Sequence, residues 1–209
     1  MFRRLAHIGL GLSLAGCAAA PLPFAPEFYR SPRTTPLSTP LAAVAVYQFM
    51  DKRPVADPTV LGEHPLRTGL YGQTLFRTTE PVATGVARAF AEGLRARGFQ
   101  VLDRTMNPLS REREEEPGSP VISGEVLEFS ASSRRTGLVS YAGGAAFHVR
   151  VQVHGRQRAV VRWERVYSNT SDAFLMSSQL VFLSRSLAES VEDTVNDLTF
   201  IEALRRSSD

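Results

Sequence analysis

The stretch Ala145-Ala-Phe-His-Val-Arg-Val-Gln-Val-His154 decides the fold of this chain. Apolar residues occupy every second position, which is the pattern of a β-strand with one buried side and one wet side. Gly155-Arg-Gln then turns the chain into a second alternating segment, in which Arg162 and Glu164 lie on the polar side. The two segments together predict an antiparallel hairpin with one solvent-facing surface.

Upstream of this hairpin, strand and helix patterns follow one another. Residues 41–50, 99–102 and 121–129 are apolar runs of strand length. Between the first two runs, apolar residues recur every fourth position over residues 82–94, which predicts a helix with one buried stripe. Gly98 stands where a left-handed residue ends such a helix.

The loops and the first residues of the helices are predicted from glycine, proline and capping residues. Residues 51–78 are rich in glycine and proline and predict a long loop, with a short hairpin near residues 70–76. Thr78 or Thr79 is expected to cap the helix that follows. A C-terminal helix is predicted from apolar spacing over residues 187–204, either from a capping box at Ser186 or with an upstream extension.

These elements predict an α+β domain, with a mostly antiparallel sheet of four to five strands and two helices packed on one face. The domain is expected over residues 41–204, followed by a tail at 205–209. Hydrophobic residues make up 43% of the 209-residue chain and charged residues 22%, which excludes wholesale disorder. A single cysteine excludes an intramolecular disulfide framework.

The N-terminus carries a targeting signal. Arg3 and Arg4 precede an apolar core over residues 5–14, which is too short to span a bilayer. Leu14-Ala-Gly-Cys17 then matches the lipobox of bacterial lipoproteins, with cleavage expected between Gly16 and Cys17. Residues 1–16 are therefore predicted to be a signal peptide, and Cys17 is predicted to be lipidated. The alternatives are an ordinary secreted protein with a chance cysteine and an uncleaved anchor.

Signal cleavage changes the charge balance and the expected partners. The chain has 24 basic and 21 acidic side chains, and removal of Arg3 and Arg4 leaves 22 basic ones. This near-neutral balance argues against a nucleic-acid partner.

Residues 17–40 hold six of the 13 prolines and predict an extended tether between the lipid anchor and the domain. Ala18 after the cysteine favours the outer membrane, with the domain facing the periplasm.

Three short motifs follow one another in the domain: Asp51-Lys-Arg53, Arg95-Ala-Arg-Gly-Phe99 and Asp172-Ala-Phe174. Together with the lipobox, their order resembles the YajG-like family of outer-membrane lipoproteins over roughly residues 41–204. No enzymatic activity is attached to that family, so the resemblance implies no catalytic residue.

The residues themselves also predict no enzyme, no cofactor and no metal site. His148 and His154 are six residues apart on one strand, about 20 Å, which is too far to share a metal. Both are expected to face solvent. The sequence contains no phosphate-binding loop and no Ser-x-x-Lys motif.

Four arginines on the hairpin form a possible interaction surface: Arg156, Arg158, Arg162 and Arg165. Their planar guanidinium groups suit phosphates or carboxylates of lipids and glycans. The alternative is a solvated face without a ligand.

Together these patterns predict a non-enzymatic, membrane-anchored lipoprotein that binds or scaffolds another envelope component, either a protein or a glycan or lipid. The binding surface is expected on the polar face of the sheet or on the 51–78 loop. A second possibility is an auxiliary lipoprotein for lipid or lipopolysaccharide transport or assembly, which needs an apolar groove between sheet and helices. A cryptic hydrolase is a third possibility.

Overall fold

The structure is a computed structural model that describes residues 43–65, 73–109, 119–136, 141–155, 160–172 and 176–208. The predicted signal peptide, Cys17 and the tether lie outside these residues. The strands are β1 (Val44–Gln48), β2 (Met50–Asp51), β3 (Val60–Pro65), β4 (Gln73–Arg77), β5 (Val101–Pro108), β6 (Val121–Arg135), β7 (Tyr141–His154) and β8 (Val161–Ser171). The helices are α1 (Val82–Arg97), α2 (Met176–Asn196) and α3 (Leu198–Ser208).

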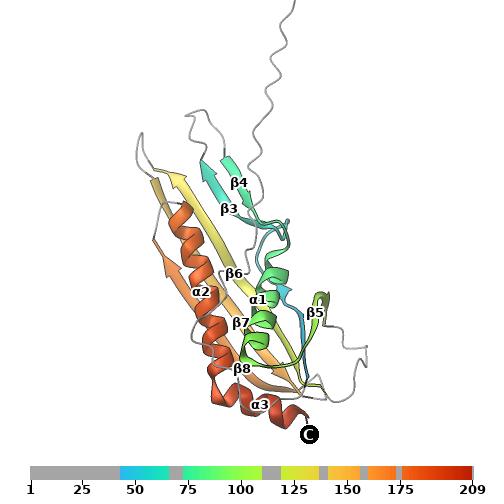
Figure 1. The fold of residues 1–209 in the computed structure, drawn as a ribbon. Helices are drawn as coiled ribbons and strands as arrows, with labels where there is room; N and C mark the ends of the chain where they lie inside the picture. The colour runs from blue at the N-terminus through green and yellow to red at the C-terminus, as the bar shows by residue number, and fades with distance from the viewer. Residues whose placement is uncertain are drawn as a thin grey trace, which may run out of the picture.

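A mixed sheet forms the centre of the domain (Figure 1). Its strands lie in the order β5-β1-β6-β7-β8, with β2 paired to β6. Strand β1 runs parallel to both β5 and β6, and β2 runs parallel to β6. Strand β7 is antiparallel to both of its neighbours, β6 and β8. Strands β3 and β4 form a separate antiparallel hairpin that lies against β6.

The predicted architecture is wrong in its details, although a broad α+β class holds. The sheet is mixed, not mostly antiparallel, and the described chain has a six-stranded sheet, a two-stranded sheet and three helices. Strands β1 and β5 can run parallel because the long connection between them, which ends in α1, brings the chain back to the same edge before β5 starts. Strand β1 then accepts β6 on its other side, which places the first strand inside the sheet.

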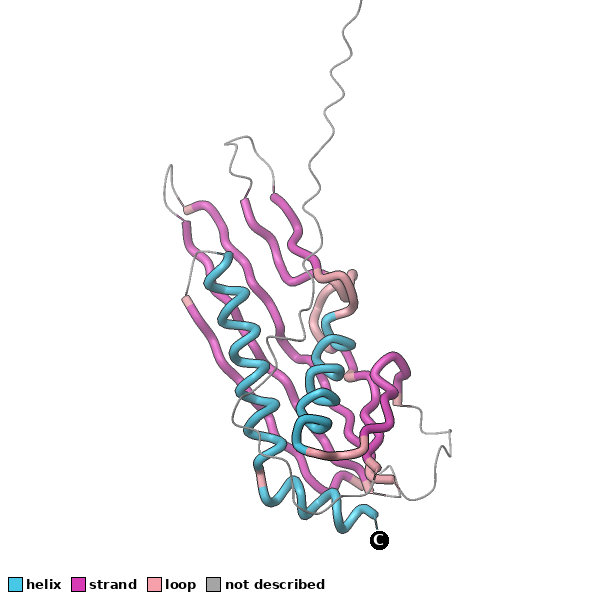
Figure 2. The backbone as a smooth tube through the Cα atoms, viewed as in Figure 1, coloured by secondary structure: helices cyan, strands magenta, loops and turns pink. Residues whose placement is uncertain are grey.

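The predicted hairpin is confirmed as β7 and β8, which pair from Ala145 with Ser171 to His154 with Val161. The alternation also predicts the buried side correctly: Phe147, Val149 and Val151 are each 0% exposed. All three helices lie over this side of the sheet (Figure 2). The core between sheet and helices therefore uses the odd-numbered residues of β7.

Helix α1 follows the predicted stripe and the predicted stop. Gly98 has φ of 99° in the left-handed region, where a side chain would be strained. Phe99 packs back into the core with 4% exposure. The predicted stripe of Val82, Val86, Phe90 and Leu94 is buried, and small residues on either side of it, such as Ala83, Ala87 and Gly93, are buried as well.

The start of α1 differs from the prediction. Its N-cap is Pro81, which makes no side-chain cap hydrogen bond, so neither Thr78 nor Thr79 caps the helix. The Thr78 hydroxyl instead donates to the Thr59 carbonyl at 3.1 Å. This bond ties the end of β4 to the loop before β3.

The predicted upstream extension of the C-terminal helix is confirmed, and the helical segment is divided in two. Helix α2 begins at Met176, and Ser186 lies buried within it, so the predicted capping box is wrong. Asp197 separates the helices, and its carboxylate accepts the Thr199 amide N–H at 2.7 Å at the start of α3. Helix α3 continues to Ser208, into the segment predicted as a tail. None of the helices in the described ranges combines the length and the apolar character needed to cross a bilayer.

Candidate functional site

The sheet has one face under the helices and one face that we call the open face. The open face carries the even-numbered side chains of β7 and the side chains that pair with them on β6 and β8. On β6, a register shift between Val126 and Glu128 changes the alternation, so Glu128 still lies opposite His148 on this face. The polar face of the predicted hairpin is thus continuous with β6, and the open face extends over three strands.

Arg150 lies at the centre of a charge network across the open face. Its guanidinium donates to Glu125 of β6 at 2.7 Å and lies 3.8 Å from Glu164 of β8. The Gln152 amide also donates to Glu164, at 2.5 Å. These contacts join three strands through opposite charges, which is a favourable cross-strand arrangement.

The two histidines of β7 differ in their surroundings. His154 is 7% exposed, and its Nε2 lies 2.7 Å from the Ser123 hydroxyl in a hydrogen bond. The expectation that both histidines face solvent is therefore wrong for His154, which is buried and hydrogen-bonded to the neighbouring strand β6. His148 is half-buried. Within the described ranges, no group of three His, Cys, Asp or Glu residues is placed to hold a metal ion.

One end of the open face is apolar. Ala45 and Tyr47 of β1 and Val121 of β6 are at most 7% exposed, and Leu102 and Leu109 pack against them. This second, smaller apolar cluster is separate from the main core. The part of the open face that reaches solvent is therefore its polar part on β7 and β8.

The four predicted arginines do not all come together. Arg156 and Arg158 lie outside the described residues. Arg162 lies beside Gly155 at the irregular start of β8. Arg165 projects toward the helices, where it lies 3.3 Å from the Asp197 carboxylate.

Arg165 also stacks over Tyr167, with its guanidinium carbon 5.2 Å from the ring centre. Burial raises the pKa of the Tyr167 phenol, against a lowering effect of its hydrogen bond with Thr194 and of the Arg165 charge. Burial also opposes ionisation of Asp197, but hydrogen bonds from Thr199 and the Arg165 charge hold the pKa of that carboxyl below its usual range. Arg165 is thus engaged within its own molecule.

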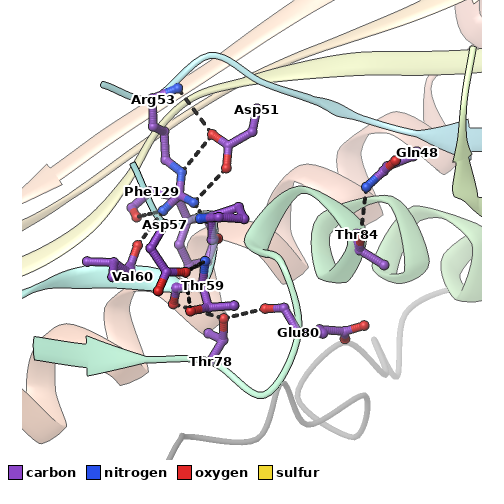
Figure 3. A network of polar contacts seen from close by, with 11 residues as sticks. Gln48, Asp51, Arg53, Asp57, Thr59, Val60, Thr78, Glu80, Thr84 and Phe129 are labelled. Atoms are coloured by element: carbon purple, nitrogen blue, oxygen red, sulfur yellow. Dashed lines mark hydrogen bonds and ion pairs between the residues drawn. The ribbon is translucent and has the colours of Figure 1, made fainter. Parts of the chain in front are cut away.

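The Asp51-Lys-Arg53 motif forms a buried clamp (Figure 3). Arg53 is 8% exposed and binds both Asp51 carboxylate oxygens, at 2.9 and 2.7 Å. Its guanidinium also donates to the carbonyls of Pro58, Val60 and Phe129. Arg53 thereby fastens the loop and β3 to β6.

Asp57 fixes the base of the same loop. Its carboxylate accepts the hydroxyl and the amide N–H of Thr59 and forms an ion pair with Arg77. The Thr59 hydrogen bonds, aided by the charges of Arg77 and Arg53, hold the pKa of Asp57 below its usual value despite some desolvation. The segment 51–78, predicted as a long loop with a short hairpin near residues 70–76, instead forms the longer β3–β4 hairpin. Arg53 and Asp57 anchor this hairpin at its base, and residues 66–72 lie outside the described residues.

Sequence reasoning missed the network around Arg150 and the role of Arg53. A usable signal for the network was the hairpin register: the turn at Gly155 places Gln152 opposite Glu164. No comparable signal existed for Arg53, because a buried arginine and an exposed one look alike in a sequence.

Comparisons with known proteins show that the chain shares its fold with a solved structure. No protein-family model matches the chain, and no curated protein matches it. The protein XCC0632 of Xanthomonas campestris, from the DUF330 family, has 10% identity and a TM-score of 0.53 over 85% of this chain and 96% of that chain. The lipoprotein GNA1162 of Neisseria meningitidis has 10% identity and a TM-score of 0.43 over 73% of this chain and 99% of that chain. At 10% identity, the first likeness shows a common fold and nothing of activity.

Proposed function

We propose that the chain is a non-enzymatic lipoprotein of the bacterial cell envelope that binds another envelope component through the open face. The observation that carries the proposal is the lipobox Leu14-Ala-Gly-Cys17, which holds the single cysteine of the chain. A diacylglycerol on that sulfur, with further acylation of the new N-terminus, gives enough buried CH₂ groups for stable anchoring. The tether would then carry the domain away from the lipid surface.

The surroundings of the polar groups support a binding role over catalysis. Glu125 and Glu164 both lie against Arg150, so their charges are used in holding three strands together. A general acid or base needs instead a free proton site aimed at a substrate. A surface of paired, partly exposed charges suits a protein partner, because the rims of protein interfaces are polar.

The second possibility, transport of lipid or lipopolysaccharide, draws less support from the packing. That role needs an apolar groove between sheet and helices. At Gly93 of α1, an added Cβ would overlap Val191 of α2, so the two helices are in close contact. Phe49 and Phe90 stack with ring centres 5.5 Å apart in the same layer. Over the described residues this layer holds one cluster of buried apolar side chains from the sheet and the helices.

The proposal also includes the family and the membrane to which the protein belongs. The motif order and the lipobox support a place among YajG-like outer-membrane lipoproteins, and Ala18 supports the outer membrane. The fold shared with XCC0632 is compatible with this assignment without being specific for it.

The anchor is tested by blocking its formation. Cells expressing the full chain are labelled with palmitate, with and without the signal-peptidase inhibitor globomycin. We expect label in the wild-type protein, a longer precursor under globomycin, and no label in Cys17→Ser. Normal processing with the inhibitor, or unchanged membrane recovery of Cys17→Ser, would contradict the lipoprotein proposal. A Ser13→Ala variant controls for changes in the signal peptide that leave the lipobox intact.

A further inference from the structure

The two edges of the main sheet differ in how they are protected. Strand β5 pairs regularly with β1 only from Val101 to Arg104, and then shifts register before ending at Pro108. Irregular pairing and proline both discourage another strand from adding at an edge. Strand β8 pairs regularly with β7 from Trp163 to Ser171.

Strand β8 has few of the features that block edge pairing. It contains no proline and no lysine, and its irregularity is confined to the end near Val161. Among the described strands it has a neighbour only on the β7 side. Its one charge that points toward the helices, Arg165, is held by Asp197. From Trp163 to Thr170, alternate backbone groups of β8 therefore point away from the sheet, as in any edge strand.

We propose that β8 is the interface for a second copy of this chain, with the two β8 strands antiparallel and a two-fold axis at Val166. Val166 lies on the open face and is 43% exposed, so two copies would bring these apolar side chains together. The sheets of both copies would join into one, with the helices of both on the same side.

The charges and the length of β8 together favour this register. When Val166 is opposite its own copy, Glu164 lies opposite Ser168, and Arg165 lies opposite Tyr167, a ring on which arginine already stacks within one chain. Arg162 lies opposite Thr170. No like charges are directly opposite, and all eleven residues of the strand are paired.

Neighbouring registers either oppose like charges or pair fewer residues. Centring on Tyr167 pairs nine residues of each strand and places Val166 opposite Ser168, so the apolar side chains no longer meet. Centring on Arg165 or on Glu164 places two like charges directly opposite, which is destabilising. Centring on Trp163 pairs only five residues of each strand. In the register centred on Val166, the two Arg165 side chains are diagonal neighbours, and each is neutralised by Asp197 of its own copy.

The test is disulfide crosslinking of the full chain in intact membranes under a mild oxidant. Directly opposite residues have Cβ atoms about 4.5–5.5 Å apart, close to disulfide range. We expect Val166→Cys to give a dimer of twice the monomer mass. The matched control is Ser168→Cys, on the same face, because the two copies of residue 168 would be about 13 Å apart along the strands. Wild type, which retains Cys17, gives the background.

A second pair makes the register itself testable. Glu164→Cys and Ser168→Cys, in two differently tagged chains expressed together, should crosslink to each other, whereas Glu164→Cys alone should not. Adding Val166→Lys to both chains should abolish that dimer by placing two charges at the axis. Absence of a Val166→Cys dimer, or equal crosslinking at positions 166 and 168, would overturn the proposal. Neither result bears on the lipid anchor, which is tested separately at Cys17.

Discussion

The two faces of β7 use neighbouring residues for different purposes. Val149 is 0% exposed under the helices, and Arg150, the next residue, holds Glu125 and Glu164 on the open face. Burial of a valine side chain stabilises a fold by about 1.5–3 kcal/mol, whereas a partly exposed ion pair contributes about 0–1 kcal/mol. The covered face therefore supplies most of the stability of the domain. Substitutions on the open face are expected to change the free energy of unfolding little.

The largest expected effect comes from placing a charge under the helices. Val149→Asp buries a carboxylate without a partner, so we expect no cooperative thermal unfolding transition by circular dichroism. Ser168→Asp is the control, since Ser168 is exposed on the open face of β8. It should change the free energy of unfolding by less than about 1 kcal/mol. Similar losses in both variants would contradict the distinction between the faces.

The next effect concerns the clamp on the covered side. Arg53→Ala leaves Asp51 without its partner and removes the donor to three carbonyls. We expect a loss of about 3–5 kcal/mol in urea unfolding, as for a buried pair broken on one side. Lys52→Ala, at the exposed neighbouring position, should be close to neutral. A loss below about 1 kcal/mol for Arg53→Ala would show that the clamp is not structural.

A smaller effect is expected where α1 meets α2. Gly93→Ala forces its Cβ against Val191 and should cost about 1–3 kcal/mol through overpacking. Combining it with Val191→Ala should recover part of that loss, because the overlap is removed. The double-mutant cycle is measured by urea unfolding. Strict additivity of the two single losses would mean that the helices do not touch there.

The smallest loss of stability is expected from substitutions of exposed charged residues, on the open face and on α2. Arg150→Gln removes the cross-strand ion pairs, and we expect a loss of about 1 kcal/mol that shrinks with added salt. Arg185→Gln removes an exposed pair with Glu189 within α2 and should cost about 0.3–0.5 kcal/mol. Thermal unfolding at low and high salt measures both. A loss above about 3 kcal/mol for Arg150→Gln would place the open face among the buried, structural parts.

Local patterns predicted the elements whose periodicity is strong. Alternation over residues 145–154 gave β7 and its buried side, and Gly98 gave the end of α1. The parallel pairing of β1 was not predicted, because strand order depends on contacts between segments far apart in the chain. Of the two starts left open for the C-terminal helix, the upstream extension through the run Leu180–Leu183 is confirmed, since α2 begins at Met176. The exposed Val181 in that run interrupts the apolar stripe, so periodicity alone did not place the start.

The candidate site was predicted in outline only. The polar face of the hairpin was predicted, but its partner Glu125 comes from β6, which no local pattern ties to Arg150. Arg165 was grouped with Arg162 because both lie on one strand, yet Arg165 projects to the helix side. Neighbouring residues of a strand point to opposite faces of the sheet, so arginines that are close in the sequence need not form one surface.

The most direct measurement of the central claim is photo-crosslinking in intact cell envelopes from two exposed glutamate positions. A photoreactive residue replaces Glu128 on the open face of β6, or Glu189 on the outer side of α2, in the full chain. We predict an adduct between this chain and another envelope component from position 128 and none from position 189. Adducts from position 189 alone, or equally from both positions, would contradict the assignment of binding to the open face.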